Sequence, residues 1–394
     1  MPDAPPDAPP ERLFPEPRPI AEVLRAHVEN AAHFWVLLSR AAEALPEGDP
    51  EVVKWSRRLT GQLEGARLGG DAGLALAADL AVATGEAPEV FVLSALALAA
   101  GRDEALVRAV ALAEAAPEAV AGLTGAVSLT PRGVLAPHVA GWLNSPRWPE
   151  RAAGIAACLR WGQSPGRHLE VLVRDPVAGV RAQALRLPGA IAFARARLAD
   201  PEPSVRLEAA AMLLRAGERA EDREAGAAAL RALAGDAGLA SERPEVAAEA
   251  LDRAVTGSPP RALAAWIKGL WEAPRTAALA LRAVGINGDP KSWPLLIAQM
   301  GEPALALPAG LAAADMLGRE PAEGALFTSD AGRLPGAVAA AHDLDFTLLP
   351  DAAAFAAVLK EGRLGRAAGE DMSLRARRLD RLRREAALPL AEAG

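Results

Sequence analysis

The fold is decided by two similar stretches of sequence, DPVAGVRAQA at residues 175–184 and DPEPSVRLEA at residues 200–209. Both follow the pattern D-P-x-x-x-V-R-x-x-A, and the second copy begins 25 residues after the first. Looser copies begin at positions 145, 243, 273 and 302, and each precedes a segment rich in Ala and Leu. A helix-pair repeat of this length is typical of a solenoid, in which each unit completes its core against its neighbours. The alternative is an irregular helical bundle.

Each residue type shared by the two copies has a mechanical reason to be there. We expect Asp to cap a helix and Pro to occupy its first position, where no N–H is needed. Val then packs inward one turn later. Arg, six residues after Asp, is expected to reach back to the capping carboxylate of its own or a neighbouring repeat. We therefore assign a repeat-structural role to Asp175, Pro176, Arg181, Asp200, Pro201 and Arg206.

The composition predicts an all-α chain. Of 394 residues, 51% are hydrophobic, whereas only 4% are aromatic and Tyr is absent. Ala and Leu must therefore fill the core, which favours close packing of helices, since β-sheets use more β-branched and aromatic residues. The formal net charge of −7 gives no strong basic excess, so we expect no binding to nucleic acid.

We expect four regions along the chain. Residues 1–19 contain eight prolines with acidic residues between them and are expected to form a disordered, extended lead-in. They lack the apolar segment of a signal peptide. Residues 20–140 form the N-terminal helical part, and residues 141–320 form the repeats. Residues 321–394 comprise a long connection, rich in Gly, Pro and Asp up to position 350, and a C-terminal helical cap.

Two aspartates mark helix starts outside the repeats. Asp49 is expected to cap a helix that Pro50 opens, and Asp351 to cap one that contains Phe355. Asp371 or Ser373 is expected to start the last helix.

No segment is long enough to cross a membrane. The longest strongly apolar stretch, residues 90–100, has about half of the roughly 20 residues that a transmembrane helix needs. We therefore expect a soluble cytoplasmic protein with no membrane span.

The repeats resemble HEAT-like repeats, with two good copies and several degenerate ones. A second resemblance rests on HVENAAHFW at 27–35, QLEGARLGGDAG at 62–73, EVF at 89–91 and GDPKSWPLL at 288–296. These stretches are similar to a bacterial HEAT-like family without assigned enzymatic activity, whose genes are often found in type VI secretion loci. The resemblance covers residues 20 to about 320 and ends near Ala322. It implies an accessory role in a type VI secretion apparatus.

The residue types that carry chemistry are scattered. The histidines lie at positions 27, 33, 138, 168 and 342, and none pairs at the i, i+4 spacing of a helical metal site. Cys158 lies in an apolar run and is expected to be buried and inert. The glycines at 69–73 favour a helix–helix turn over a phosphate loop, since no lysine follows a glycine anywhere in the chain. His342, Asp343 and Asp345 read as an acidic loop, with a cation site as the alternative. We predict no catalytic residue, cofactor or metal.

Some HEAT-like proteins excise damaged bases with Trp, Arg and Asp in a concave groove. That alternative stays open through Trp142, Trp148, Trp161, Trp266, Trp271 and Trp293. The negative net charge disfavours it, because affinity for duplex DNA depends on many phosphate contacts.

The last predicted helix carries concentrated positive charge and an apolar stripe. It can be a solvated face or a basic amphipathic helix that docks to an acidic partner. The candidate partner-binding residues are Arg375, Arg377, Arg378, Arg381, Arg383 and Arg384. We therefore predict a HEAT-like α-solenoid of stacked antiparallel helix pairs with atypical terminal units, acting as a non-catalytic protein-binding scaffold. The alternative is a nucleic-acid-binding or base-excising repeat protein, and an enzyme of another class comes third.

Overall fold

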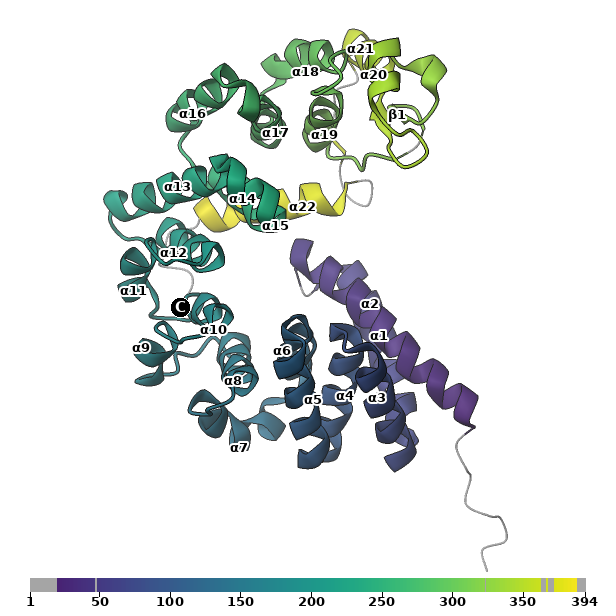
Figure 1. Cartoon of the computed structure of the whole chain (residues 1–394), viewed down its shortest axis with the longest axis vertical. Helices are drawn as coiled ribbons and strands as arrows, with labels where there is room; N and C mark the ends of the chain where they lie inside the picture. Colours follow the sequence, from purple (N-terminus) through teal and green to yellow (C-terminus); the bar gives the residue numbers. More distant parts are fainter. Residues whose placement is uncertain (1–19, 47, 323, 363–365, 368–371, 388–394) are drawn as a thin grey trace, which may run out of the picture. The chain divides into compact units, whose positions relative to one another are not determined.

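The structure is a computed structural model that describes residues 20–46, 48–322, 324–362, 366–367 and 372–387. Twenty-two α-helices make up most of these described residues, and the predicted all-α, solenoid-like class is confirmed. The chain divides into two compact units, and we describe each by itself (Figure 1). Unit 1 comprises Met1–Leu37 and Lys54–Leu135, and unit 2 comprises Leu38–Val53 and Ala136–Gly394. The predicted lead-in at 1–19 and the predicted start at Asp371 lie outside the described residues.

Unit 1 is built around one central helix. Its elements are α1 (Ala21–Ala44), α2 (Pro50–Leu68), α3 (Asp71–Thr84), α4 (Ala87–Ala100), α5 (Asp103–Ala115), η1 (Pro117–Ala119) and α6 (Val120–Leu129), while α1, α2 and α7 (Arg132–Leu143) each cross a unit boundary. α4 packs against α3, α5 and α6. It is apolar on every side, as expected of a helix enclosed by others, and four consecutive residues from Val90 to Leu93 are fully buried. At Gly122 on α6, a Cβ would meet the carbonyl oxygen of Ala87 at 2.0 Å, so only glycine permits this approach to α4.

Unit 2 stacks helix pairs so that alternate helices form a continuous row. Its elements are α8 (Trp148–Arg160), α9 (His168–Leu172), α10 (Ala178–Ala184), α11 (Ile191–Arg197), α12 (Pro203–Ala216), α13 (Ala220–Gly235), α14 (Ala237–Glu242), α15 (Pro244–Gly257), α16 (Pro260–Glu272), η2 (Pro274–Thr276), α17 (Ala277–Asn287), η3 (Pro290–Ser292), α18 (Trp293–Gln299), α19 (Ala306–Leu317), β1 (Phe327–Thr328), η4 (Ala331–Arg333), α20 (Gly336–Ala341), β2 (Leu349–Pro350), α21 (Ala352–Lys360) and α22 (Leu374–Ala387). Contacts run from α8 to α10, α12, α15, α17 and α19 in turn. Small alanines at these contacts let the backbones approach.

An Arg–Asp ladder joins successive repeats of this row. Arg181 donates to both carboxylate oxygens of Asp200, at 3.0 and 2.8 Å, and to the carbonyl oxygens of Asp175 and Pro176 in its own turn. Arg151, in the looser copy that begins at position 145, pairs with Asp175 in the same way, at 2.6 and 2.9 Å. Of the two partners predicted for the arginine, the structure shows the carboxylate of the next repeat.

The Asp-Pro dipeptides do not occupy the helix-capping positions that the sequence pattern predicts. Asp175 and Asp200 accept hydrogen bonds from N–H groups two residues ahead, at Val177 and Glu202, and so close a turn before the helix. The helices begin later, at Ala178 and Pro203, so neither Pro176 nor Pro201 occupies a first helical position. The dipeptide therefore shapes the turn that leads into the helix, and the predicted helix cap was wrong by two residues in both copies. Arg206 donates to the carbonyl oxygens of Asp200 and Pro201.

Other predicted features are present. Asp49 accepts from the N–H of Glu51, and Asp351 accepts from that of Ala354 at the start of α21, which buries Phe355. The predicted long connection contains more structure than expected, since β1 and β2 pair antiparallel and α20 packs its Val338 into a small core. In the part of the chain that the structure describes, no helix is long and apolar enough to cross a bilayer.

The ladder predicts an unequal cost for two chemically matched substitutions. Asp200→Asn keeps the hydrogen bond to Glu202 but leaves Arg181, whose side chain is 12% exposed, without its carboxylate. We expect a loss of about 2–3 kcal/mol in unfolding free energy, because breaking a buried pair strands a charge. Glu170→Gln removes an exposed pair with Arg174 and should cost under about 1 kcal/mol. Urea denaturation followed by circular dichroism measures both, and equal costs would contradict a special role for the ladder.

Candidate functional site

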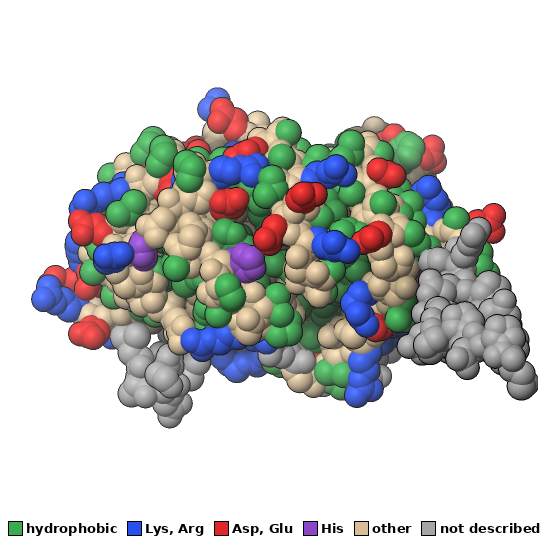
Figure 2. Space-filling view, turned by 90° about the horizontal axis from the view of Figure 1, so that it is seen from below, with side chains coloured by type: hydrophobic (Ala, Val, Ile, Leu, Met, Phe, Trp, Pro, Cys, Tyr) green, Lys and Arg blue, Asp and Glu red, His purple; other side chains and the backbone are tan. Residues whose placement is uncertain are grey.

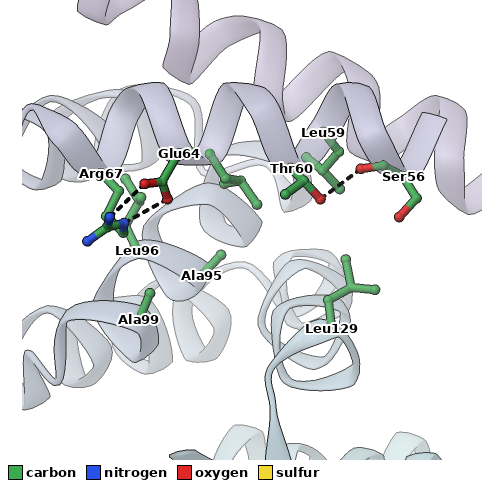
Figure 3. A pocket seen from close by; sticks show the side chains of 10 residues that line it. Ser56, Leu59, Thr60, Glu64, Arg67, Ala95, Leu96, Ala99 and Leu129 are labelled. Atoms are coloured by element: carbon green, nitrogen blue, oxygen red, sulfur yellow. Dashed lines mark hydrogen bonds and ion pairs between the residues drawn. The ribbon is translucent and has the colours of Figure 1, made fainter. Parts of the chain in front are cut away.

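An open groove of about 290 Å³ lies in unit 1 between α2, α4 and α6 (Figure 3). Its floor is apolar and its upper edge carries polar side chains. The lining residues are Ser56, Leu59, Thr60, Leu63, Glu64 and Arg67 of α2, Ala95, Leu96 and Ala99 of α4, and Leu129 of α6.

The helical period explains why these residues share one groove. The lining positions of α2 recur at intervals of three and four residues, which places them on a single face of that helix. From Ser56 to Arg67 this face runs for roughly 16 Å, or three turns. On α4 the small side chains of Ala95 and Ala99 leave the space open, and Leu129, 52% exposed, forms one wall.

The polar edge of the groove is largely satisfied within the chain. Arg67 donates two hydrogen bonds to Glu64, at 2.8 and 2.6 Å, and these bonds lower the pKa of the Glu64 carboxyl. Thr60 donates its hydroxyl to the carbonyl oxygen of Ser56, one turn earlier on α2. Such a site can take up apolar side chains in the manner of a helix-in-groove interface.

A cation–aromatic stack lies on the opposite side of α2, against α1. The rings of Phe34 and Trp55 stack at 5.9 Å. Arg58 lies over both rings, at 5.8 and 5.2 Å from their centroids, and Lys54 lies 4.4 Å from that of Trp55. The stack and the groove thus use two faces of one helix.

Two of the arginines predicted to form a free basic face, Arg375 and Arg378, belong instead to an ion-pair cluster in unit 2 around buried aspartates. α22 lies against α15 (Figure 1) and packs Ala376, Leu379 and Leu382 inward. Arg375 donates to both oxygens of Asp252, at 2.9 and 3.1 Å, and to Asp315 at 2.8 Å.

Neighbouring arginines complete this cluster. Arg378 donates to Asp252 at 2.7 Å and to Glu249, and Arg282 pairs with Asp315 at 3.0 Å. Burial alone would lower the pKa of Arg375, but the carboxylates of Asp252 and Asp315 outweigh it and raise that pKa. Burial lowers the pKa of Arg282.

The remaining arginines of α22 also contact this unit, except for Arg384, which is exposed. Arg377 donates to the carbonyl oxygen of Met372, and Arg381 donates to that of Ala42 at 3.0 Å. Arg383 donates to Asp380 at 2.7 Å and to the carbonyl oxygen of Ile286. The prediction of a free docking face on this helix is therefore corrected for five of its six arginines, because carboxylates and carbonyls of the same unit already bind them; Arg384 alone of the six stays exposed.

Most of the tryptophans on which the alternative of a base-excising protein depended are packed against neighbouring helices. Trp142 and Trp293 are buried, Trp266 packs on the core around α15, and Trp271 is 37% exposed. Acidic and basic side chains are interspersed on the face shown in Figure 2, without an extended field of one sign among its coloured residues.

The other candidate groups have structural surroundings. Cys158 is buried, and burial raises the pKa of its thiol. His27 hydrogen-bonds to Gln62 at 2.7 Å, and His342 to the carbonyl oxygen of Pro303 at 2.8 Å. Gly69 and Gly70 form the turn between α2 and α3, and a Cβ at Gly73, in the first turn of α3, would meet the Ala66 carbonyl oxygen at 2.1 Å. Within the described ranges, no three His, Cys, Asp or Glu residues gather as metal ligands would.

Comparisons with known proteins add no family. No protein-family model matches the chain, and no curated protein matches it. A solved structure described as that of an engineered protein aligns at 17% identity over 93% of this chain and 95% of that one, with a TM-score of 0.28. A TM-score this low carries no argument. The resemblance to the secretion-associated family stays a prediction.

The buried cluster predicts that Asp252 holds α22 in place. Asp252→Asn removes the buried carboxylate that Arg375 and Arg378 share and leaves each with one carboxylate partner, so the amide hydrogens of α22 should exchange about a hundredfold faster, while Arg384→Gln should leave them unchanged. Hydrogen exchange with mass spectrometry on the full chain measures both variants. Unchanged protection in Asp252→Asn would contradict this role.

The attachment of α22 should also weaken in acid. Burial alone would raise the pKa of Glu249, but Arg253 and Arg378 outweigh it and lower that pKa. A carboxyl whose folded pKa is lowered stabilises the fold above its ordinary value of 4.5 and loses that effect as the pH falls through the folded value. We therefore expect α22 protection, corrected for intrinsic exchange, to decline below about pH 4.5.

Two glutamate variants test the source of that decline. Glu249→Gln should flatten it, whereas Glu245→Gln, on the same helix but paired with exposed Arg243, should not. A decline of equal size in all three proteins would contradict the role of Glu249.

Proposed function

We propose that the chain is a non-catalytic protein-binding scaffold whose groove between α2, α4 and α6 receives an amphipathic helix of a partner protein. The observation that carries this proposal is the groove itself, an apolar floor three turns long, open to solvent, with Leu129 half exposed at its wall. A helix with apolar residues at i, i+3, i+4 and i+7 matches such a floor.

The surroundings of the groove also support binding. Its floor rests on α4, which is enclosed by its neighbours, so the site is preformed and little ordering entropy is lost when a partner binds. Leu59 and Leu96 are buried beneath the floor, so they keep it in place.

For the biological setting, we propose a cytoplasmic accessory component of a type VI secretion apparatus. Support comes from the resemblance of residues 27–35, 62–73, 89–91 and 288–296 to the bacterial HEAT-like family. The first two stretches include α1 and α2 residues of the unit that holds the groove.

A charge placed in the groove should abolish binding, while the same charge elsewhere should not. A displayed library of amphipathic helical peptides, selected on the full chain, supplies binders. Leu129→Glu should reduce their binding more than tenfold, because a desolvated carboxylate would face their apolar stripe. Val107→Glu is the matched control, since Val107 on α5 is also 52% exposed but does not line the groove.

Circular dichroism checks that both variants keep their helices. If no helical peptide is enriched, or if both variants bind the selected peptides equally well, the groove is not the binding site and the proposal fails.

A further inference from the structure

A basic cluster lies on α2 outside the groove. It consists of Lys54, Arg57 and Arg58, which fall within the five residues KWSRR at 54–58 and are all exposed. Lys54 and Arg58 lie on the side of α2 that holds the cation–aromatic stack, opposite the groove. Residues three and four apart are neighbours on a helix, so Arg57 and Arg58 both lie beside Lys54. The three cations therefore form one surface that is separate from the groove.

The charge of the basic cluster is not neutralised within the chain. None of its three side chains forms an ion pair with any residue that the structure describes. Other exposed arginines of unit 1 are paired, as Arg67 is with Glu64 and Arg102 with Asp71. Like charges at this spacing repel each other and destabilise the helix that carries them. The helix thus gains no ion pair from the cluster, and its positive charge stays available to a partner.

Aromatic rings hold two of the cations in place. The ring of Trp55 stacks on that of Phe34, with 5.9 Å between their centroids. Over the Trp55 ring, the Nζ atom of Lys54 lies 4.4 Å and the guanidinium carbon of Arg58 5.2 Å from the centroid, and such contacts attract a cation to the ring face. A stacked guanidinium keeps N–H donors for a carboxylate. Side chains ordered in advance lose less entropy when a partner binds.

We infer from this arrangement that the basic cluster binds an extended acidic segment of a partner protein. Lys54 and Arg58 are one turn apart, about 6 Å along the helix axis. In an extended chain, side chains at alternate positions point to the same side and are roughly 7 Å apart. Asp or Glu residues at alternate positions therefore match the spacing of these cations. This inference goes beyond the proposed function, because the cluster lies outside the groove and recognises charge instead of an apolar stripe.

The small number of cations favours an acidic segment over nucleic acid. Affinity for duplex DNA depends on many phosphate contacts, and the chain as a whole has a formal net charge of −7. Two or three carboxylates are enough to neutralise the basic cluster. Because its cations are exposed, binding weakens as salt rises.

Carbodiimide coupling tests the inference, because it joins a carboxylate to a lysine amine where the two lie together. The probe is a short peptide of Ser and Gly, blocked at both ends, with Glu at three alternate positions. The full chain has four lysines, all exposed, and a digest analysed by mass spectrometry shows which of them carries the peptide: Lys54, Lys268, Lys291 or Lys360. At low salt, Lys54 should carry it at least about fourfold more often than any other lysine, since two arginines beside it each contribute a factor of about two.

A double variant keeps the reacting amine and removes the neighbouring charges. In Arg57→Gln with Arg58→Gln, coupling at Lys54 should fall about fourfold, because two exposed ion pairs are lost. Added salt should lower coupling on the unaltered chain in the same way. Arg108→Gln is the matched control, since it removes an exposed cation of α5 and should leave coupling at Lys54 intact. Circular dichroism checks that each variant keeps its helices.

Three results would overturn the inference. The first is equal coupling at the four lysines, or coupling at Lys54 that survives in the double variant. The second is loss of this coupling in Leu129→Glu, which alters the groove and should leave the basic cluster unaffected. The inference and the proposed function can therefore fail separately. The third is suppression of the coupling by duplex DNA at physiological salt, which would assign the basic cluster to nucleic acid.

Discussion

Unit 2 depends on buried charges that only a neighbouring repeat can satisfy. The guanidinium of Arg181 binds the carbonyls of its own turn and the carboxylate of Asp200 in the next, so one side chain fixes both the turn and the distance between repeats. Apolar contacts among alanines tolerate sliding, whereas a bidentate ion pair does not. The ladder therefore supplies the register that a small-residue core lacks.

Buried carboxylates also fix the position of α22, which supplies their arginine partners. Asp252 and Asp315 come from α15 and α19, and their charges are balanced by Arg375 from a helix far along the chain. Removing one partner leaves an uncompensated charge in a largely apolar setting. This costs more free energy of unfolding than replacing both partners with apolar residues. The cluster thus fixes one position for α22 on a surface that would otherwise accept several.

Local chemistry was predictable from the sequence, and long-range pairing was not. The Asp and Arg of the repeat could be identified because their partners lie within one repeat length, although the helix starts were misplaced, since an Asp-Pro turn and a capped helix share the same letters. The sequence predicted a solvent-facing set of arginines on α22, because periodicity shows which face of a helix is charged. It does not show which other helices pack against that face. Asp252 and Asp315 gave no signal, because Asp252 is one of three acids in α15 and Asp315 is a lone acid in the Ala-rich helix α19. The groove could not be predicted from the sequence, because Ala95, Ala99 and Leu129 line a common surface only when three helices pack together.

The buried ion pairs of α22 also impose an order of events during synthesis. Arg375 follows Asp315 by 60 residues and Asp252 by 123 residues along the chain. At the usual 5–20 residues per second, the ribosome needs roughly 6 to 25 s to proceed from Asp252 to its arginine. For that interval Asp252 lacks the arginines with which it pairs, whereas Asp315 already has Arg282. The repeats around α15 and α19 must therefore wait in an incomplete state, open at the place where α22 will lie, and a ribosome that stalls between the two would leave that state exposed to the cell's chaperones.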